Sequence, residues 1–257
     1  MDETTNGRRK AIVTKQPHGD ADSIELRNWA TPSSSSKEGS ASNHNRRIQR
    51  ALQDLQGVDE INIRQTLETI GSSCTGSNAY HLVTREGDVL LNAFEETTCC
   101  SRCWCGPARS FRMSIQNAES EEILQVVRPH RCDACCCPCC LMKSMVQTPG
   151  GYVLGYTKQN WSLCGAVFSI INRNGHRIAG MESPCCPCRC CTNIDISILS
   201  RNGEEGAVTK RWGGRKHNTN MDHEFFVLNF PSGTDLQTKG LLLGSAFLVD
   251  YMFFEMT

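Results

Sequence analysis

The sequence has no net charge and no apolar segment at its start. Its 27 basic and 27 acidic residues balance. No overall field therefore draws the chain to nucleic acid or to an anionic membrane, and any such attraction must be local. The opening residues, MDETTNGRRKAIV, lack the apolar stretch of a signal peptide, and position 2 is Asp, where N-myristoylation needs glycine. We therefore expect a cytosolic chain, in which thiols stay reduced and structural disulfides are uncommon.

Motifs of common catalytic sites are also missing. The sequence contains no GxSxG elbow, no HExxH and no P-loop, and its seven histidines are scattered. Cys74, in GSSCTGS, has no evident base partner. We therefore predict a protein without chemical catalysis. The first 45 residues also lack a PxxP run, which argues against binding of SH3 or WW modules through that segment.

The chain divides at about residue 45. Residues 1–45 are polar and include TPSSSSKEGSASNHN, a composition that buries too little apolar surface to order, so we predict disorder there. Residues 46–257 form the predicted folded domain. It opens with RRIQRALQDLQ, in which Ile48, Ala51, Leu52 and Leu55 share one face of an amphipathic helix.

The folded region reads as a series of β-hairpins. Alternating apolar residues flank turns at 85–88 and again after FRMSIQ, and Asn-Gly pairs at 174–175 and 202–203 mark two more turns. Four hairpins with no clear helix between them predict an antiparallel all-β domain, either a barrel or a sandwich.

Seventeen cysteines are the most unusual feature of the sequence. Fifteen lie in three clusters, at 99–105, 132–140 and 185–191, and each cluster follows one of the first three hairpins. Because a hairpin returns to its starting end, the clusters should fall at one end of the sheet if residues 141–165 contribute an even number of strands. Three pairs have zinc-like CxxC spacing: Cys100 with Cys103, Cys132 with Cys135, and Cys185 with Cys188. The first and the third pair are the candidate metal ligands.

The run GLLLGSAFLVDYMFF, at 240–254, is the most apolar segment of the chain. As a helix it would span about 22 Å, short of the roughly 30 Å of a hydrocarbon core. A helix that is apolar on nearly every face and too short to span is more often buried in protein, so we favour burial over membrane insertion. Its apolar side chains are Leu241, Leu242, Leu243, Phe247, Leu248, Val249, Phe253 and Phe254.

Four motifs together resemble the phospholipid scramblase family over about residues 46–257. They are CGPARSF at 105, RPHRCDACCCPCC at 128, GYVLGY at 151 and GSAFLVDYMFFE at 244. The resemblance implies a closed, antiparallel, twelve-stranded barrel around a central hydrophobic C-terminal helix, as in tubby-like domains. It also implies calcium-stimulated, ATP-independent, bidirectional movement of phospholipids between bilayer leaflets.

The resemblance further identifies the second cluster as a palmitoylation site. Its candidate residues are Cys135, Cys136, Cys137, Cys139 and Cys140. Several neighbouring cysteines could carry the two or more acyl chains that stable anchoring requires, and a run of three adjacent cysteines suits one tetrahedral ion poorly. The implied location is the cytoplasmic face of the plasma membrane, with the nucleus as an alternative for the unacylated chain.

The segment that the family links to calcium reads DHEFFVLNFPSGTD here, at 222–235. Asp222 and Glu224, with help from Asp235, offer the oxygen ligands that calcium prefers. Positions five and twelve, which bind the ion in an EF-hand-like loop, are Phe226 and Gly233. We therefore predict weak calcium binding at most.

The stretch TKRWGGRKH aligns with a nuclear import sequence of the family. Its cations Lys210, Arg211, Arg215 and Lys216 could bind an import receptor, an anionic lipid surface or nucleic acid, or form an ordinary solvated turn.

Two other functions are alternatives to lipid movement. One is a palmitoyl-anchored membrane adaptor or regulator without scrambling activity, and the other is a zinc-binding nucleic-acid cofactor.

Overall fold

Twelve antiparallel strands close into a barrel in the computed structural model, which describes Arg46 and residues 48–67, 78–96, 110–131, 140–185, 193–210 and 225–254. The strands are β1 (Glu60–Leu67), β2 (Asn78–Val83), β3 (Val89–Glu96), β4 (Phe111–Gln116), β5 (Glu122–Arg128), β6 (Lys143–Gln147), β7 (Val153–Asn160), β8 (Val167–Asn172), β9 (Arg177–Glu182), β10 (Ile194–Ser200), β11 (Glu205–Lys210) and β12 (Phe225–Asn229). The disorder predicted for 1–45, and hence the domain boundary, lies outside the described residues and stays a prediction.

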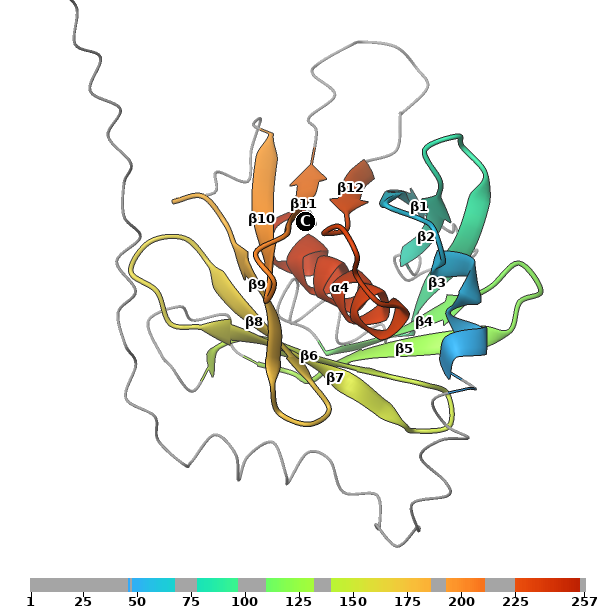
Figure 1. Cartoon of the computed structure of the whole chain (residues 1–257), viewed down its shortest axis with the longest axis horizontal. Coiled ribbons are helices and arrows are strands. Elements are labelled where there is room, and N and C mark those ends of the chain that lie inside the picture. The colour runs from blue at the N-terminus through green and yellow to red at the C-terminus, as the bar shows by residue number, and fades with distance from the viewer. Residues whose placement is uncertain are drawn as a thin grey trace, which may run out of the picture. The chain divides into compact units, whose positions relative to one another are not determined.

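Each strand pairs with its sequence neighbours, and the pairing of β1 with β12 closes the ring (Figure 1). All four predicted hairpins are present, as β2–β3, β4–β5, β8–β9 and β10–β11. Gly175 and Gly203 occupy the left-handed region in two of the turns, with φ of 82° and 85°, as an Asn-Gly turn requires. The choice between barrel and sandwich is thus settled for a barrel, and closure leaves no exposed sheet edge.

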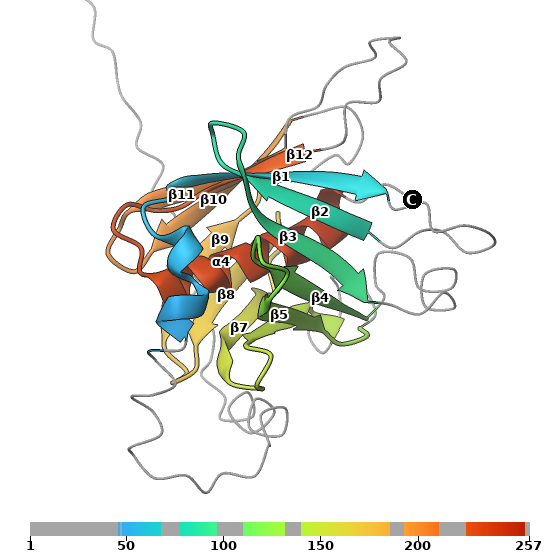
Figure 2. The same ribbon diagram turned by 90° about the vertical axis from the view of Figure 1, so that its right-hand side faces the viewer.

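A helix fills the barrel. α4 (Leu236–Val249) continues into a π-helical turn, η4 (Asp250–Phe254), and every residue from Lys239 to Phe254 is buried (Figure 2). The predicted apolar segment 240–254 is therefore the enclosed helix. The observed helix begins four residues earlier because Asp235 caps it, accepting from the Thr238 amide at 3.0 Å. The sequence pattern did not predict this first turn, because Gln237, Thr238 and Lys239 are polar.

Small residues let α4 approach the wall closely. A Cβ added at Gly244 would lie 2.3 Å from Val146 Cγ2, so only glycine fits there without a shift. Ser245, the next residue, has its Oγ 2.6 Å from Thr157 Oγ1 of β7, and it also donates to the Leu241 carbonyl at 2.8 Å. The hydroxyls of Ser245 and Thr157 are thus paired with each other, and Ser245 is also paired with the backbone.

The predicted amphipathic helix covers one end of the barrel. Residues 48–51 are helical and lead into the short 3-10 helix η1 (Gln53–Leu55). Ile48, Leu52 and Leu55 are buried and join the same hydrophobic core as α4. Within the described residues, no helix combines the length and the apolar character needed to cross a membrane.

Candidate functional site

The two ends of the barrel differ in the residues that their connections carry. Strand direction alternates around the ring, so the connections after β1, β3, β5, β7, β9 and β11 all join strand ends at the same end. The connections after β1, β3, β5, β7 and β9 contain all seventeen cysteines of the sequence. We call this the cysteine end and its opposite the helix-start end, because α4 begins there. Residues 141–165 contribute β6 and β7, the even number of strands on which the prediction of a shared end depended.

The last turns of α4 and η4 lie at the cysteine end. Lys210, the last residue of β11, donates from Nζ to the Phe254 carbonyl at 2.7 Å. Tyr80 of β2 donates from Oη to the buried Asp250 carboxylate at 2.7 Å, and its ring meets Phe247 edge-on at 5.2 Å. Tyr251 stacks on Phe111 with the ring centroids 4.1 Å apart. These polar and aromatic contacts hold the end of the helix inside the barrel.

Charge also separates the ends. Among the described exposed and half-exposed residues, basic side chains outnumber acidic ones at the cysteine end, and the reverse holds at the helix-start end. The cysteine end has Arg64, Arg112, Arg131, Lys143, Lys158 and Lys210 against Glu96, Glu182 and Asp195. At the helix-start end the acidic residues outnumber the basic residues Arg46, Arg50, Arg85, Arg173, Arg177 and Arg201. The acidic residues are Asp54, Asp59, Glu60, Glu86, Asp88, Glu119, Glu121, Glu122, Glu204, Glu205 and Asp235. A barrel with this arrangement would turn its cysteine end toward an anionic surface.

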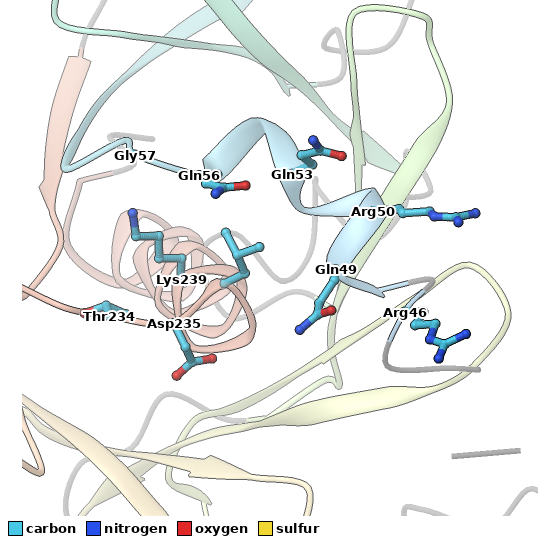
Figure 3. A pocket seen from close by; sticks show the side chains of 10 residues that line it. Arg46, Gln49, Arg50, Gln53, Gln56, Gly57, Thr234, Asp235 and Lys239 are labelled. Carbon is cyan, nitrogen blue, oxygen red and sulfur yellow. The ribbon is translucent and has the colours of Figure 1, made fainter. Parts of the chain in front are cut away.

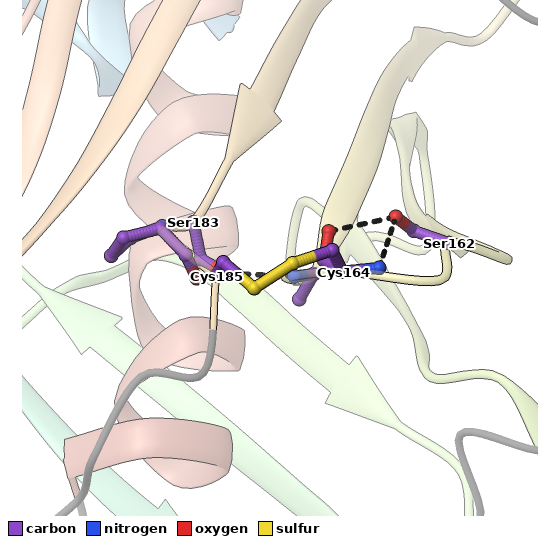
Figure 4. Close-up of a disulfide and its surroundings, with 6 residues drawn as sticks. Ser162, Cys164, Ser183 and Cys185 are labelled. Atoms are coloured by element: carbon purple, nitrogen blue, oxygen red, sulfur yellow. Dashed lines mark hydrogen bonds between the residues drawn. A yellow bond between two sulfur atoms is a disulfide. The ribbon is translucent and has the colours of Figure 1, made fainter.

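The connection from β7 to β8, residues 161–166, exposes apolar side chains at the cysteine end. Leu163 is 89% exposed and Trp161 is 45% exposed. Cys164 forms a disulfide with Cys185, just beyond the end of β9, and the Ser162 hydroxyl donates to the Cys164 carbonyl at 2.9 Å (Figure 4). The disulfide differs from our expectation of reduced thiols, because the closed barrel brings two cysteines 21 positions apart to adjacent strand ends, with a Cα–Cα distance of 5.0 Å.

A polar groove of about 540 Å³ lies at the helix-start end, between the N-terminal helical residues and the start of α4 (Figure 3). Its lining is Arg46, Gln49, Arg50, Gln53, Gln56, Gly57, Thr234, Asp235, Leu236 and Lys239. Lys239 donates from Nζ to the carbonyls of Leu55 and Val58, at 3.2 and 2.5 Å. Burial lowers the pKa of Lys239, and the nearby Asp59 carboxylate opposes that shift. Lys239 thus ties α4 to the segment that covers this end.

The predicted calcium ligands are not all described. Asp222 and Glu224 lie outside the described residues. Asp235 caps α4, where its carboxylate accepts from the amide and hydroxyl of Thr238 at 3.0 and 2.6 Å. It lies beyond the end of β12, and the strand's five residues span about 17 Å. That length separates Asp235 from Phe225, the residue that directly follows Glu224. A calcium site built on Asp222 and Glu224 stays a prediction, without structural support for a contribution from Asp235.

The other predicted sites are described only in part. Cys135, Cys136, Cys137 and Cys139 lie outside the described residues, and Cys140 is half-buried beside the start of β6. Cys100, Cys103 and Cys188 also lie outside, and the Cys185 sulfur is bonded to Cys164, so a zinc site that includes it requires that disulfide to be open. In the described ranges no three His, Cys, Asp or Glu residues gather as metal ligands. Of the basic stretch, Lys210 contacts Phe254, and Arg211, Arg215 and Lys216 lie outside the description.

Sequence reasoning overlooked several residues at these ends. Trp161, Leu163 and Cys164 lie in NWSLCG, a short connection that carried no recognised motif. An isolated cysteine between two strands was the available signal for a disulfide. No local sequence pattern indicated the Tyr80–Asp250 hydrogen bond, because the two residues are 170 positions apart.

Comparison with known proteins decides the family. A model of the family described as Scramblase matches residues 40–256. The chain belongs to the scramblase family. Human phospholipid scramblase 1 is 35% identical over 211 residues, covering 80% of this chain and 66% of that protein. Bovine phospholipid scramblase 2 is 35% identical over 210 residues, covering 80% of this chain and 72% of the relative.

A further relative, human phospholipid scramblase family member 5, is 32% identical over 208 residues, covering 79% of this scramblase-family chain and 77% of that protein. The chain thus spans just under two thirds of the length of human phospholipid scramblase 1 and somewhat more of the other two. No solved structure matches this scramblase-family chain.

Proposed function

We propose that this chain moves phospholipids between bilayer leaflets in both directions, without ATP, and that calcium stimulates the movement. The observation that carries the proposal is membership of the scramblase family, and most of this chain resembles members of that family that are named phospholipid scramblases. The absence of common catalytic motifs from the sequence is compatible with transport rather than chemical conversion of lipid.

The proposal places the cysteine end on the membrane. Five connections at that end carry the seventeen cysteines, among them the CCCPCC block, which would be palmitoylated at Cys135, Cys136, Cys137, Cys139 and Cys140. Two or more acyl chains give stable attachment, whereas one gives only marginal binding. The excess of basic residues at the same end supports its orientation toward the anionic cytoplasmic leaflet of the plasma membrane.

The enclosed helix favours a second candidate function. Residues 241–254 of α4 and η4 are at most 8% exposed, so in this conformation the helix does not contact lipid. A palmitoyl-anchored adaptor or regulator that does not move lipid itself would need no release of the helix. Lipid movement, in contrast, requires a path on the outside of the barrel or a calcium-dependent release of the helix from it.

A dithionite quenching assay separates the two functions. Purified full-length protein is reconstituted into liposomes that hold fluorescent phospholipid, without ATP, and quenching is followed with and without calcium. Scrambling predicts quenching beyond the outer-leaflet half, with more quenching when calcium is present. Quenching that stops at half in both conditions, in vesicles shown to contain the protein, would favour the adaptor.

A double variant tests the proposed calcium response, and a chemical treatment tests the proposed palmitoylation. Asp222→Asn combined with Glu224→Gln should abolish the calcium response while leaving the calcium-free rate unchanged. Asp235→Asn is the matched control, because Asp235 caps α4 at the other end of β12. Hydroxylamine, which cleaves thioesters, should weaken the attachment of the protein to cell membranes if palmitate anchors it. Attachment that hydroxylamine leaves unchanged would argue against acylation as the anchor.

A further inference from the structure

We propose that the β7–β8 connection, residues 161–166, is a membrane-contacting loop that inserts Trp161 and Leu163 into the interface of an anionic phospholipid bilayer. The inference rests on the proposed membrane function and deepens it, because it names a protein surface that contacts lipid independently of any acyl chain.

The first argument is the exposure of these two side chains. The described residues include five large apolar side chains at least one third exposed, and two of them are Trp161 and Leu163. Leu163 is the most exposed of the five, at 89%. Single exposed apolar residues are common on protein surfaces, but here a tryptophan and a leucine stand two positions apart in one short connection. Tryptophan favours the headgroup region and leucine the acyl boundary, so the pair suits partial insertion.

The second argument is that the loop is held in place rather than loose. The Ala166 amide donates to Ser183 Oγ at 2.7 Å, and the Ser183 amide donates to the Ala166 carbonyl at 2.9 Å. Gly165 has φ of 73°, and a Cβ there would lie 2.6 Å from the Ser183 carbonyl oxygen. With the Cys164–Cys185 disulfide, these contacts fix the base of the loop against the end of β9 (Figure 4). The exposed conformation of Leu163 is therefore preorganised, and little ordering entropy is lost on binding.

Two basic side chains lie close to the loop in the strands that lead into it. Lys158 precedes the loop by two positions and is the cross-strand partner of Lys143, which puts two cations on one outer face of β6 and β7. Cations at such a position are attracted to an anionic bilayer. The loop also belongs to the end whose connections carry the cysteines. The exposed apolar side chains of the loop, the two lysines and the proposed acylation sites therefore all belong to one end of the barrel, which we infer to be the end that faces the bilayer.

Vesicle sedimentation with hydroxylamine-treated full-length protein tests the inference, since removal of thioester-linked acyl chains leaves only protein contacts. The probes are phosphatidylcholine vesicles with and without phosphatidylserine. Wild type should bind the phosphatidylserine vesicles, and Leu163→Asp should weaken that binding at least about tenfold, the equivalent of one leucine's burial. Leu199→Asp is the matched control: Leu199 is 54% exposed on β10 near the helix-start end, and its substitution should not change binding.

Tryptophan quenching supplies a second readout on the same samples. Phospholipids brominated on their acyl chains should quench part of the wild-type fluorescence, and that part should be missing in Trp161→Phe. The inference is overturned if wild type does not bind phosphatidylserine vesicles, if Leu163→Asp binds as well as Leu199→Asp, or if Trp161→Phe shows the same quenching as wild type.

The two proposals can fail separately. Loss of vesicle binding in Leu163→Asp, together with quenching by dithionite that stops at half for wild type, would support the loop and reject lipid movement. Full calcium-stimulated scrambling together with unchanged vesicle binding of Leu163→Asp would reject the loop alone. Thermal melting of each variant confirms that it is folded before its binding is compared.

Discussion

At the scale of single residues, the buried polar groups Asp250 and Ser245 of the enclosed helix each contact a partner on the barrel wall, and these contacts fix how the helix sits. Asp250 is 4% exposed and accepts from Tyr80 at 2.7 Å. A carboxylate in such a position requires hydrogen bonds, because burial of an unpartnered charge is costly. The Tyr80–Asp250 pair thus locks the register of α4 against β2 at the cysteine end.

Removing the Tyr80 hydroxyl should destabilise the fold. Tyr80→Phe keeps the ring contact with Phe247 but takes a donor from the buried Asp250 carboxylate, and we expect a loss of about 1–3 kcal/mol in the free energy of unfolding. Urea denaturation measures it. Tyr152→Phe, at a half-buried residue near the helix-start end, is the control. An unfolding free energy equal to wild type in Tyr80→Phe would mean that the bond contributes nothing.

Lys239 should give stability a characteristic pH dependence. Burial lowers its pKa in the folded state below the usual 10.5, so in the interval between the two values the unfolded chain binds more protons. Stability therefore rises with pH across that interval. Lys239→Met lacks this contribution, so the stability difference between wild type and variant should shift in favour of wild type as pH rises toward 10.5. Urea denaturation at several pH values measures it, and a constant difference would contradict the lowered pKa.

At the scale of elements, the helix α4 is matched to its surrounding wall by glycine as much as by leucine. Gly244 faces Val146 so closely that a methyl group would overlap it, whereas a Cβ at Gly240 would meet Leu124, Leu52 and Leu154 at 3.3–3.5 Å. The two glycines lie one helical turn apart, and only one of them is sterically required.

This steric difference predicts different changes in the free energy of unfolding when each glycine is replaced by alanine. Gly244→Ala should destabilise the protein by about 1–3 kcal/mol, because overpacking outweighs the better helix propensity of alanine. Gly240→Ala should be neutral within about 1 kcal/mol, because its neighbours need to move only a few tenths of an ångström. Chemical denaturation of the pair decides the point, and equal stabilities would show that the wall yields at Val146.

The strands, turns and buried helix of this fold were largely predictable from the sequence, whereas the contacts between residues far apart in the chain were not. Asn174-Gly175 and Asn202-Gly203 located two turns, because local backbone geometry demands those residues. The apolar run located the buried helix but missed its first turn, because Leu236 is followed there by the polar residues Gln237, Thr238 and Lys239. The disulfide and the exposed loop were not predicted, because the proximity of Cys164 and Cys185 depends on strand pairing rather than on any local pattern. The predicted acylation, zinc and calcium sites fall mainly on residues outside the described structure.

At the scale of the whole molecule, the barrel has two chemically different ends. One receives the cysteine-bearing connections, the basic residues and the end of the helix, and the other carries the acidic turns and the polar groove. Such a polarity suits a protein that meets one surface in one orientation. The covalent link between Cys164 and Cys185 belongs to the first end.

Opening that link should weaken both the fold and the proposed membrane contact. Cys164→Ser with Cys185→Ser removes a loop closure over 21 positions, for which chain entropy predicts a loss of about 3 kcal/mol. Denaturation measures the stability, and vesicle sedimentation measures the binding. Reductant should bring wild type toward the double variant and leave the variant itself unchanged. A double variant as stable as oxidised wild type would show that the hydrogen bonds around Ser183 hold the loop alone.

The position of α4 in the chain has a consequence for synthesis. The helix that fills the barrel follows all twelve strands, and β1 closes the ring only with β12. While the chain is being made, the inward faces of the strands therefore emerge with nothing to cover them, and contacts of such long sequence separation form slowly. Strand faces that are still uncovered favour aggregation until α4 is available to pack against them. Closure of the barrel thus waits until β12 and α4 have been made, and we expect a chaperone that shields apolar strands to bind the chain before then.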